Sequence, residues 1–201
     1  MTTTGVAQDV PEKALRVDAE RRRQALLCAA ASVFLAEGLD APLESVARQA
    51  GVGIATLYRR FPTRDALVEE VFEAKMTAYA DRIEAAAEQA TSDPWTAFRD
   101  YVRDLCDMQV TDPAFGRVLL RPMQGSPLFA DAHARAMRAN TRLVSRVRKA
   151  KAVRADVRES DLYLVAVAIG ALVTEPGPIP AERAACRLAD LFLDAVKGPA
   201  A

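Results

Sequence analysis

The fold is decided by residues 45–61, which read SVARQAGVGIATLYRRF. Gly51 and Gly53 divide this stretch and leave a helical segment of about two turns on either side, 43–50 and 54–61. Helices this short are unstable alone in water, so both need a larger body to pack on. Two short helices joined by a glycine turn are typical of the helix-turn-helix motif, whose second helix enters the DNA major groove.

Positive charge is concentrated on the same stretch. Residues 45–64 contain four Arg and no acidic residue, in a chain whose 27 Lys and Arg balance 27 Asp and Glu. A local cationic surface on a neutral protein is what attraction to phosphate requires. An Arg pair on a short helix is, taken alone, more often a solvated face. The charge and the glycine turn together favour contact with DNA, at base edges and at phosphates.

Start and stop signals predict helices over the rest of the chain, and strand patterns are close to absent, so the predicted fold class is all-α. Asp93-Pro94, Asp112-Pro113 and Ser126-Pro127 each place a capping side chain before a helix-initiating proline. The nine predicted helices run from Asp18 to Gly38, over 43–50 and 54–61, from the cap Thr63 onward, and over 94–110, 113–121, 127–150, 160–174 and 181–196.

Composition excludes several other classes of protein. The longest uncharged apolar run, Leu162–Val173, has 12 residues, fewer than the roughly 18 that a membrane span needs. The N-terminus shows no apolar signal segment, so we expect a cytoplasmic protein with no membrane partner. The three cysteines lie far apart and there is one His, which predicts buried free thiols, no metal site and no cofactor.

The region from Glu20 to Phe72 resembles the DNA-binding domain of TetR-family transcriptional regulators. The resemblance rests on AGV at 50–52, TLY at 56–58 and FPTRDAL at 61–67, which stand in the family's order and spacing. It implies an N-terminal three-helix DNA-binding domain and a larger C-terminal helical domain that binds a small molecule and dimerises. We therefore expect a flexible tail over 1–18, a DNA-binding domain over 19–79 with its helix-turn-helix at about 42–61, and a ligand-binding and dimerisation domain over 80–201.

The resemblance also assigns residues on the predicted recognition helix. Thr56, Tyr58 and Arg60 match contacts that the family makes with DNA, and Arg59 matches a more variable position. A basic phosphate contact of the family is matched by Arg64. Charge, position and resemblance together give the expected DNA-binding set: Ser45, Arg48, Thr56, Tyr58, Arg59, Arg60 and Arg64. One departure is Pro42, which stands where the family usually has Ser or Thr; it suits a first helical position but donates no hydrogen bond.

For the C-terminal domain, the resemblance implies an unidentified small-molecule effector and a homodimer formed by Leu162–Val173 and Ala181–Val196. The alternative for 162–173 is a central core helix. Aromatic and Met side chains in the middle helices supply both core and any cavity wall. The pocket candidates are Trp95, Phe98, Tyr101, Phe115, Met123 and Met137.

The expected function is that of a sequence-specific transcriptional repressor released from a DNA operator by its effector, not an enzyme. An activator uses the same physics. A helical enzyme or carrier that has kept the fold is the alternative from another class, but no nucleophile or acid–base constellation is identifiable. A nucleotide loop at Gly51-Val52-Gly53 is excluded because no strand and no third glycine accompany it. Arg16 and Arg21–Arg23 could form an arm on DNA, although Asp18 and Glu20 lie beside them.

Overall fold

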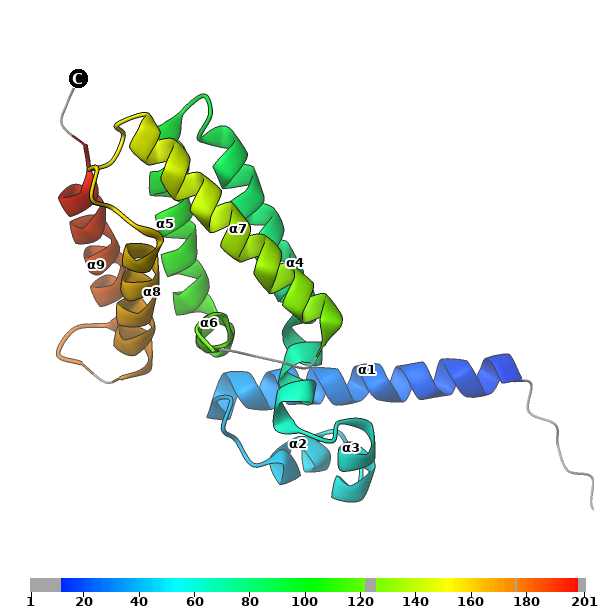
Figure 1. Ribbon diagram of the computed structural model, residues 1–201. Coiled ribbons are helices and arrows are strands. Elements are labelled where there is room, and N and C mark those ends of the chain that lie inside the picture. The colour runs from blue at the N-terminus through cyan, green and yellow to red at the C-terminus, as the bar shows by residue number, and fades with distance from the viewer. Residues whose placement is uncertain (1–11, 122–125, 176, 199–201) are drawn as a thin grey trace, which may run out of the picture.

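The computed structural model describes residues 12–121, 126–175 and 177–198. This part of the chain folds into nine α-helices, arranged as a small head below a larger helical body (Figure 1). In chain order they are α1 Glu12–Glu37, α2 Leu43–Gln49, α3 Ile54–Arg60, α4 Arg64–Gln89, α5 Pro94–Thr111, α6 Pro113–Leu119, α7 Pro127–Lys149, α8 Glu159–Thr174 and α9 Ala181–Val196. The predicted all-α fold is confirmed.

The head consists of α1, α2, α3 and the first turns of α4. Its two short helices are held as expected, because Val46 and Leu57 are fully buried and Phe61 is nearly so. They pack with Leu26 and Phe34 of α1 in one continuous apolar core. The first helix is longer than predicted: it begins at Glu12, so 12–17 are helical and not part of a tail, while the predicted tail over 1–11 lies outside the described residues.

The body is layered. α4 leaves the head and runs upward against α7, α5 lies in the middle, and α8 and α9 lie side by side on the far side (Figure 1). The predicted caps hold the helix starts: the side chains of Thr63, Asp93, Asp112 and Ser126 each accept a hydrogen bond from a backbone N–H three residues on. The C-cap Gly38 has a positive φ of 85° and ends α1 where expected.

The cysteines differ from expectation. Cys106 is buried, but Cys28 and Cys186 are exposed. Cys106 of α5 and Cys186 of α9 also come together in space, and with Asp107 their ligand atoms lie within 4.8 Å of one another. Burial, with a smaller contribution from the neighbouring Cys186, raises the pKa of the Cys106 thiol to about 12. None of the described helices combines the length and the apolar character that crossing a bilayer demands.

Candidate nucleic-acid interface

The angle between α2 and α3 is set by a Schellman turn at the end of α2. The N–H of Val52 donates to the Ala47 carbonyl at 3.0 Å, and the N–H of Gly51 donates to the Arg48 carbonyl at 3.2 Å. This pattern needs a residue in the left-handed region, and Gly51 supplies it with a φ of 66°. Gly51 therefore has a conformational role that Gly53, with a φ of −70°, does not share.

A Gly51→Ala variant is expected to lose about 1–2 kcal/mol of unfolding free energy, because an L-residue at positive φ costs about that much. No atom lies within 4 Å of a Cβ built at either glycine, so backbone conformation alone decides the difference. Gly53→Ala is the matched control and is expected to lose less. Thermal unfolding followed by circular dichroism measures both. Equal losses in the two variants contradict the role assigned to Gly51.

α3 turns one side inward and the other to solvent. Leu57 is fully buried and anchors the helix, whereas Thr56, Tyr58, Arg59 and Arg60 are exposed. Tyr58 is 46 % exposed, so its phenol is accessible from solvent. The helix thus presents two cations, a phenol and a hydroxyl group on one short exposed surface.

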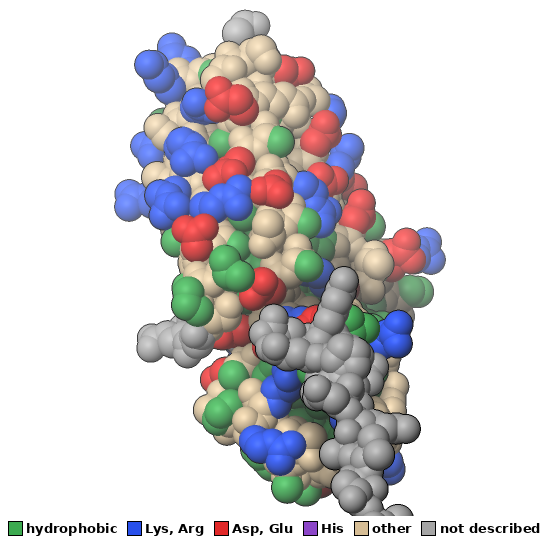
Figure 2. Space-filling view, turned by 90° about the vertical axis from the view of Figure 1, so that its right-hand side faces the viewer, with side chains coloured by type: hydrophobic (Ala, Val, Ile, Leu, Met, Phe, Trp, Pro, Cys, Tyr) green, Lys and Arg blue, Asp and Glu red, His purple; other side chains and the backbone are tan. Residues whose placement is uncertain are grey.

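A hollow of about 450 Å³ lies between the first half of α1 and α3. Arg22 and Arg23 line it from α1, and Thr56, Arg59 and Arg60 line it from α3. Arg23 forms ion pairs with Glu20 at 2.9 Å and with Glu70 at 2.6 Å, so these two carboxylates of the same chain offset much of its positive charge. Figure 2 shows basic side chains on this head, at the foot of the view.

The remaining predicted contacts sit around the motif in different settings. Arg48 of α2 is exposed and donates from Nη2 to the hydroxyl of Ser45 at 3.2 Å. Arg64 is half-buried, and its Nη1 donates to the carbonyl oxygens of Leu39 and Ala41 at 2.9 and 2.6 Å. Arg64 therefore fastens the start of α4 to the loop before α2, and any phosphate contact must use its other N–H groups.

α2 begins at Leu43, where the prediction placed its start. Pro42 is the N-cap residue and not the first helical residue, and its side chain makes no capping hydrogen bond. Glu44 in the first turn provides the negative charge that favours a helix N-terminus. Of the residues that could form an N-terminal arm, Arg16 has a side chain outside the described residues, while Arg21–Arg23 belong to α1.

Comparison with known proteins identifies the family of the chain. Residues 26–71 match the family model described as bacterial regulatory proteins, tetR family. Residues 93–197, more than half of the chain, match the model described as transcriptional regulator SbtR-like, C-terminal domain. A solved TetR transcriptional regulator from Streptomyces coelicolor is 33 % identical over 89 % of this chain and 99 % of that chain, with a TM-score of 0.53. The chain belongs to the TetR family of transcriptional regulators.

Two further solved structures match at lower sequence identity. A TetR transcription regulatory protein from Mycobacterium vanbaalenii is 28 % identical, covers 91 % of this chain and 99 % of its own, and has a TM-score of 0.50. FadR from Bacillus subtilis, solved in complex with stearoyl-CoA, is 13 % identical over 87 % of this chain and 99 % of its own, with a TM-score of 0.58, and shares the fold alone. No curated protein matches significantly. TetR-family members are DNA-binding transcription regulators and not enzymes, so the same holds for this chain.

The body of this TetR-family protein contains a cavity of about 580 Å³ among α4, α5, α6, α7 and α8. Of the six pocket candidates, Tyr101 and Met137 line it. The others lie elsewhere: Phe98 packs on Phe192, Trp95 lies under the Lys197 ammonium, and Phe115 stacks on Phe72. The sixth candidate, Met123, lies outside the described residues.

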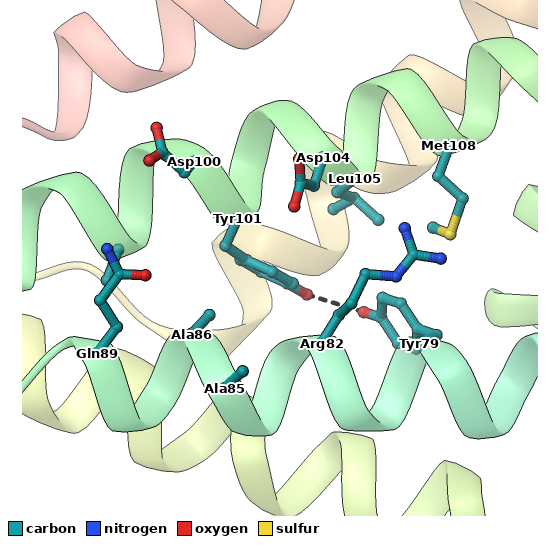
Figure 3. Close-up of a pocket in the computed structure, with 11 residues that line it drawn as sticks. Tyr79, Arg82, Ala85, Ala86, Gln89, Asp100, Tyr101, Asp104, Leu105 and Met108 are labelled. Atoms are coloured by element: carbon teal, nitrogen blue, oxygen red, sulfur yellow. Dashed lines mark hydrogen bonds between the residues drawn. The ribbon is translucent and has the colours of Figure 1, made fainter.

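Sequence reasoning missed the polar side chains in this cavity. Gln109, Asn140 and Arg121 line it, together with Glu159 and His133. Gln109 follows Val102, Leu105 and Cys106 on the buried side of α5. A polar amide at a position where the helical pattern expects an apolar residue was the signal that could have indicated a polar group in the cavity. A smaller hollow of about 220 Å³ shares Tyr79, Tyr101 and Leu105 with the cavity. Figure 3 shows the two tyrosines reaching toward each other from α4 and α5.

Proposed function

We propose that this TetR-family regulator is a homodimeric repressor that a small molecule releases from its operator. The observation that carries the proposal is that one short helix, α6, forms both a wall of the large cavity and a contact with the DNA-binding head. Its Gly116 and Leu119 line the cavity, and so does Leu120, the C-cap residue that follows it. From the same helix, Arg117 Nη2 lies 2.6 Å from the Asp40 carboxylate, just beyond α1.

The contact between α6 and the head has a polar and an apolar part. The hydrogen bond from Arg117 lowers the pKa of Asp40, so the pair is ionised at neutral pH. In the apolar part, the ring centroid of Phe115 lies 5.9 Å from that of Phe72 on α4. The Phe72 centroid lies 6.5 Å from that of Phe34 on α1. A shift of α6 that accommodates a ligand therefore changes the seating of α1 and α4, and with them the recognition helix.

Dimerisation would pair α8 and α9 with those of a second copy. From Leu162 to Thr174 α8 carries no charged residue, and its outward side chains include Tyr163, Leu164 and Val167. Leu191 of α9 is also exposed, and α8 and α9 enclose an open groove of about 600 Å³. Exposed apolar surface of this extent on a helix pair favours burial against a partner. In this proposal the expected domain 19–79 binds the operator, and the expected domain 80–201 binds the effector and forms the dimer.

In this proposal the dimer places two α3 helices in successive major grooves, about 34–36 Å apart. A ligand-bound dimer whose heads no longer match that spacing loses affinity, and a coupling of about 1–3 kcal/mol lowers it roughly five- to 150-fold. Occupation of an operator that overlaps a promoter then represses, and the ligand relieves repression. The FadR relative, whose structure holds stearoyl-CoA, supports a ligand role for a body of this fold.

Footprinting of the purified protein on the DNA upstream of its own gene tests the proposal. The expected result is a protected palindrome with half-sites about one helical turn apart, and an affinity that falls steeply with salt because phosphate contacts release counterions. Compounds that raise the thermal midpoint of the protein are then expected to weaken operator binding. Protection without two-fold symmetry contradicts the dimer model, and compounds that bind without affecting the operator complex contradict the release model.

A further inference from the structure

Gln109 is the most deeply buried polar side chain of the ligand cavity. It is 1 % exposed, and neither its Oε1 nor its Nε2 has a hydrogen-bond partner. The amide is packed between two glycines: a Cβ at Gly116 of α6 would lie 2.9 Å from Gln109 Cγ, and a Cβ at Gly170 of α8 would lie 3.0 Å from Oε1. Both helices thus leave a space that this side chain fills.

An unpartnered buried amide is unfavourable, because its donor and its acceptor have lost water and gained nothing in exchange. Most buried polar groups in folded proteins are hydrogen-bonded, so an exception on a cavity wall points to a partner that arrives from outside. Volume alone does not explain the residue, since an apolar side chain of the same length fills the gap between the glycines without that penalty.

Other polar groups of the cavity add both donors and acceptors. Asn140 Oδ1 is buried and has no partner among the described residues. The hydroxyls of Tyr79 and Tyr101 share one hydrogen bond of 2.8 Å (Figure 3), which leaves the hydrogen of the accepting hydroxyl free to donate. Burial raises the pKa of both phenols, so both stay neutral and keep their hydrogens.

The charge of the cavity favours an uncharged ligand. Its lining contains one Arg and one carboxylate, Arg121 and Glu159, whose formal charges cancel. Arg121 adds a buried Nη1 without a partner, which is a further hydrogen-bond donor at the cavity wall. Most of the remaining lining is apolar and includes Leu105, Leu119 and Leu120.

We propose that Gln109 recognises the polar head of the effector, and that the effector is a largely apolar molecule with one uncharged group that both donates and accepts hydrogen bonds, such as a hydroxyl. This inference rests on the proposed function, since it concerns the ligand of the same cavity. The amide reaches the head group by turning from its seat between Gly116 and Gly170 into the cavity. Its departure removes the side chain that fills the gap between α6 and α8, and so frees α6, which holds Arg117 against the head.

The test compares three probes of one chain length, decan-1-ol, its methyl ether and decanoate, by calorimetric titration of the full-length protein without DNA. The alcohol is expected to bind about three- to tenfold more tightly than the ether, which cannot donate, and more tightly than the anion. Gln109→Met, which keeps the length and removes the amide, is expected to abolish the preference for alcohol over ether. It is also expected to raise the thermal midpoint of the free protein.

Leu143→Met is the matched control, because Leu143 is fully buried in the core outside the cavity lining, and the swap conserves volume without removing a polar group. It is expected to leave the order of the probes unchanged. Equal alcohol affinity in wild type and Gln109→Met overturns the role of the amide, and tighter binding of decanoate overturns the uncharged head. Both readings are made without DNA, so they are distinct from a failure of the proposed function, which shows itself in the operator footprint.

Discussion

An Arg60→Ala variant is expected to bind its operator between about thirtyfold and 10⁴-fold more weakly than the wild type. Arg60 is exposed at the end of α3, on the surface that carries Thr56, Tyr58 and Arg59. A bidentate contact between Arg and a base is worth about 1–3 kcal/mol of discrimination, and a dimer makes it twice, which gives about 2–6 kcal/mol. Because Arg60 is exposed, the thermal midpoint is expected to stay unchanged.

Arg48→Ala is the matched control for base reading. Arg48 is an exposed Arg of the same motif, on α2 and not on the recognition helix. As a phosphate contact, it is expected to weaken binding to all sequences alike and to lower the salt slope by about one per head. A gel-shift competition between operator and random DNA separates the two effects. If Arg60→Ala keeps both affinity and sequence preference, the assignment of Arg60 to DNA is wrong.

Helix starts could be predicted from sequence because capping is local. Asp93, Asp112 and Ser126 each stand immediately before a proline, and all three cap the helix that the dipeptide announced. From α5 onward the predicted ends lie within two residues of the observed ones. The predicted start of α1, Asp18, was wrong. Pro11 stands immediately before Glu12 and is itself a local start signal, but the prediction rested on the apolar face of the helix, which begins later.

The DNA-binding surface and the cavity differ in how well they could be predicted from the sequence. The predicted DNA-binding surface lies within some 20 consecutive residues of one motif, so spacing and charge were enough to predict it. The cavity is assembled from five helices, and apolar periodicity does not say which neighbour a buried side chain faces. Phe98 and Tyr101 both lie on the buried side of α5, yet Phe98 packs on Phe192 of α9 while Tyr101 reaches the cavity.

A Leu164→Arg variant is expected to be monomeric and to lose about 10²- to 10⁴-fold in operator affinity. Leu164 is 61 % exposed on α8, so the isolated chain accepts Arg there without strain, and the thermal midpoint of the monomer tests that. In the proposed dimer the same position is buried against apolar surface, where an unpaired charge is strongly unfavourable. A monomer binds only one half of the palindrome. In a dimer, binding of the first head holds the second head at a high effective concentration near its half-site, and a monomer lacks this advantage.

Ser145→Arg provides the control, because it adds the same charge to an exposed site on α7, outside the helix pair α8 and α9. Sedimentation velocity is expected to show dimers for the wild type and for Ser145→Arg, and monomers for Leu164→Arg. A single half-site should then bind Leu164→Arg and the full-length wild type with similar affinity, since α3 itself is unchanged. Dimers of Leu164→Arg with full operator affinity place the interface elsewhere, and the uncharged outer surface of α8 then needs another partner to cover it.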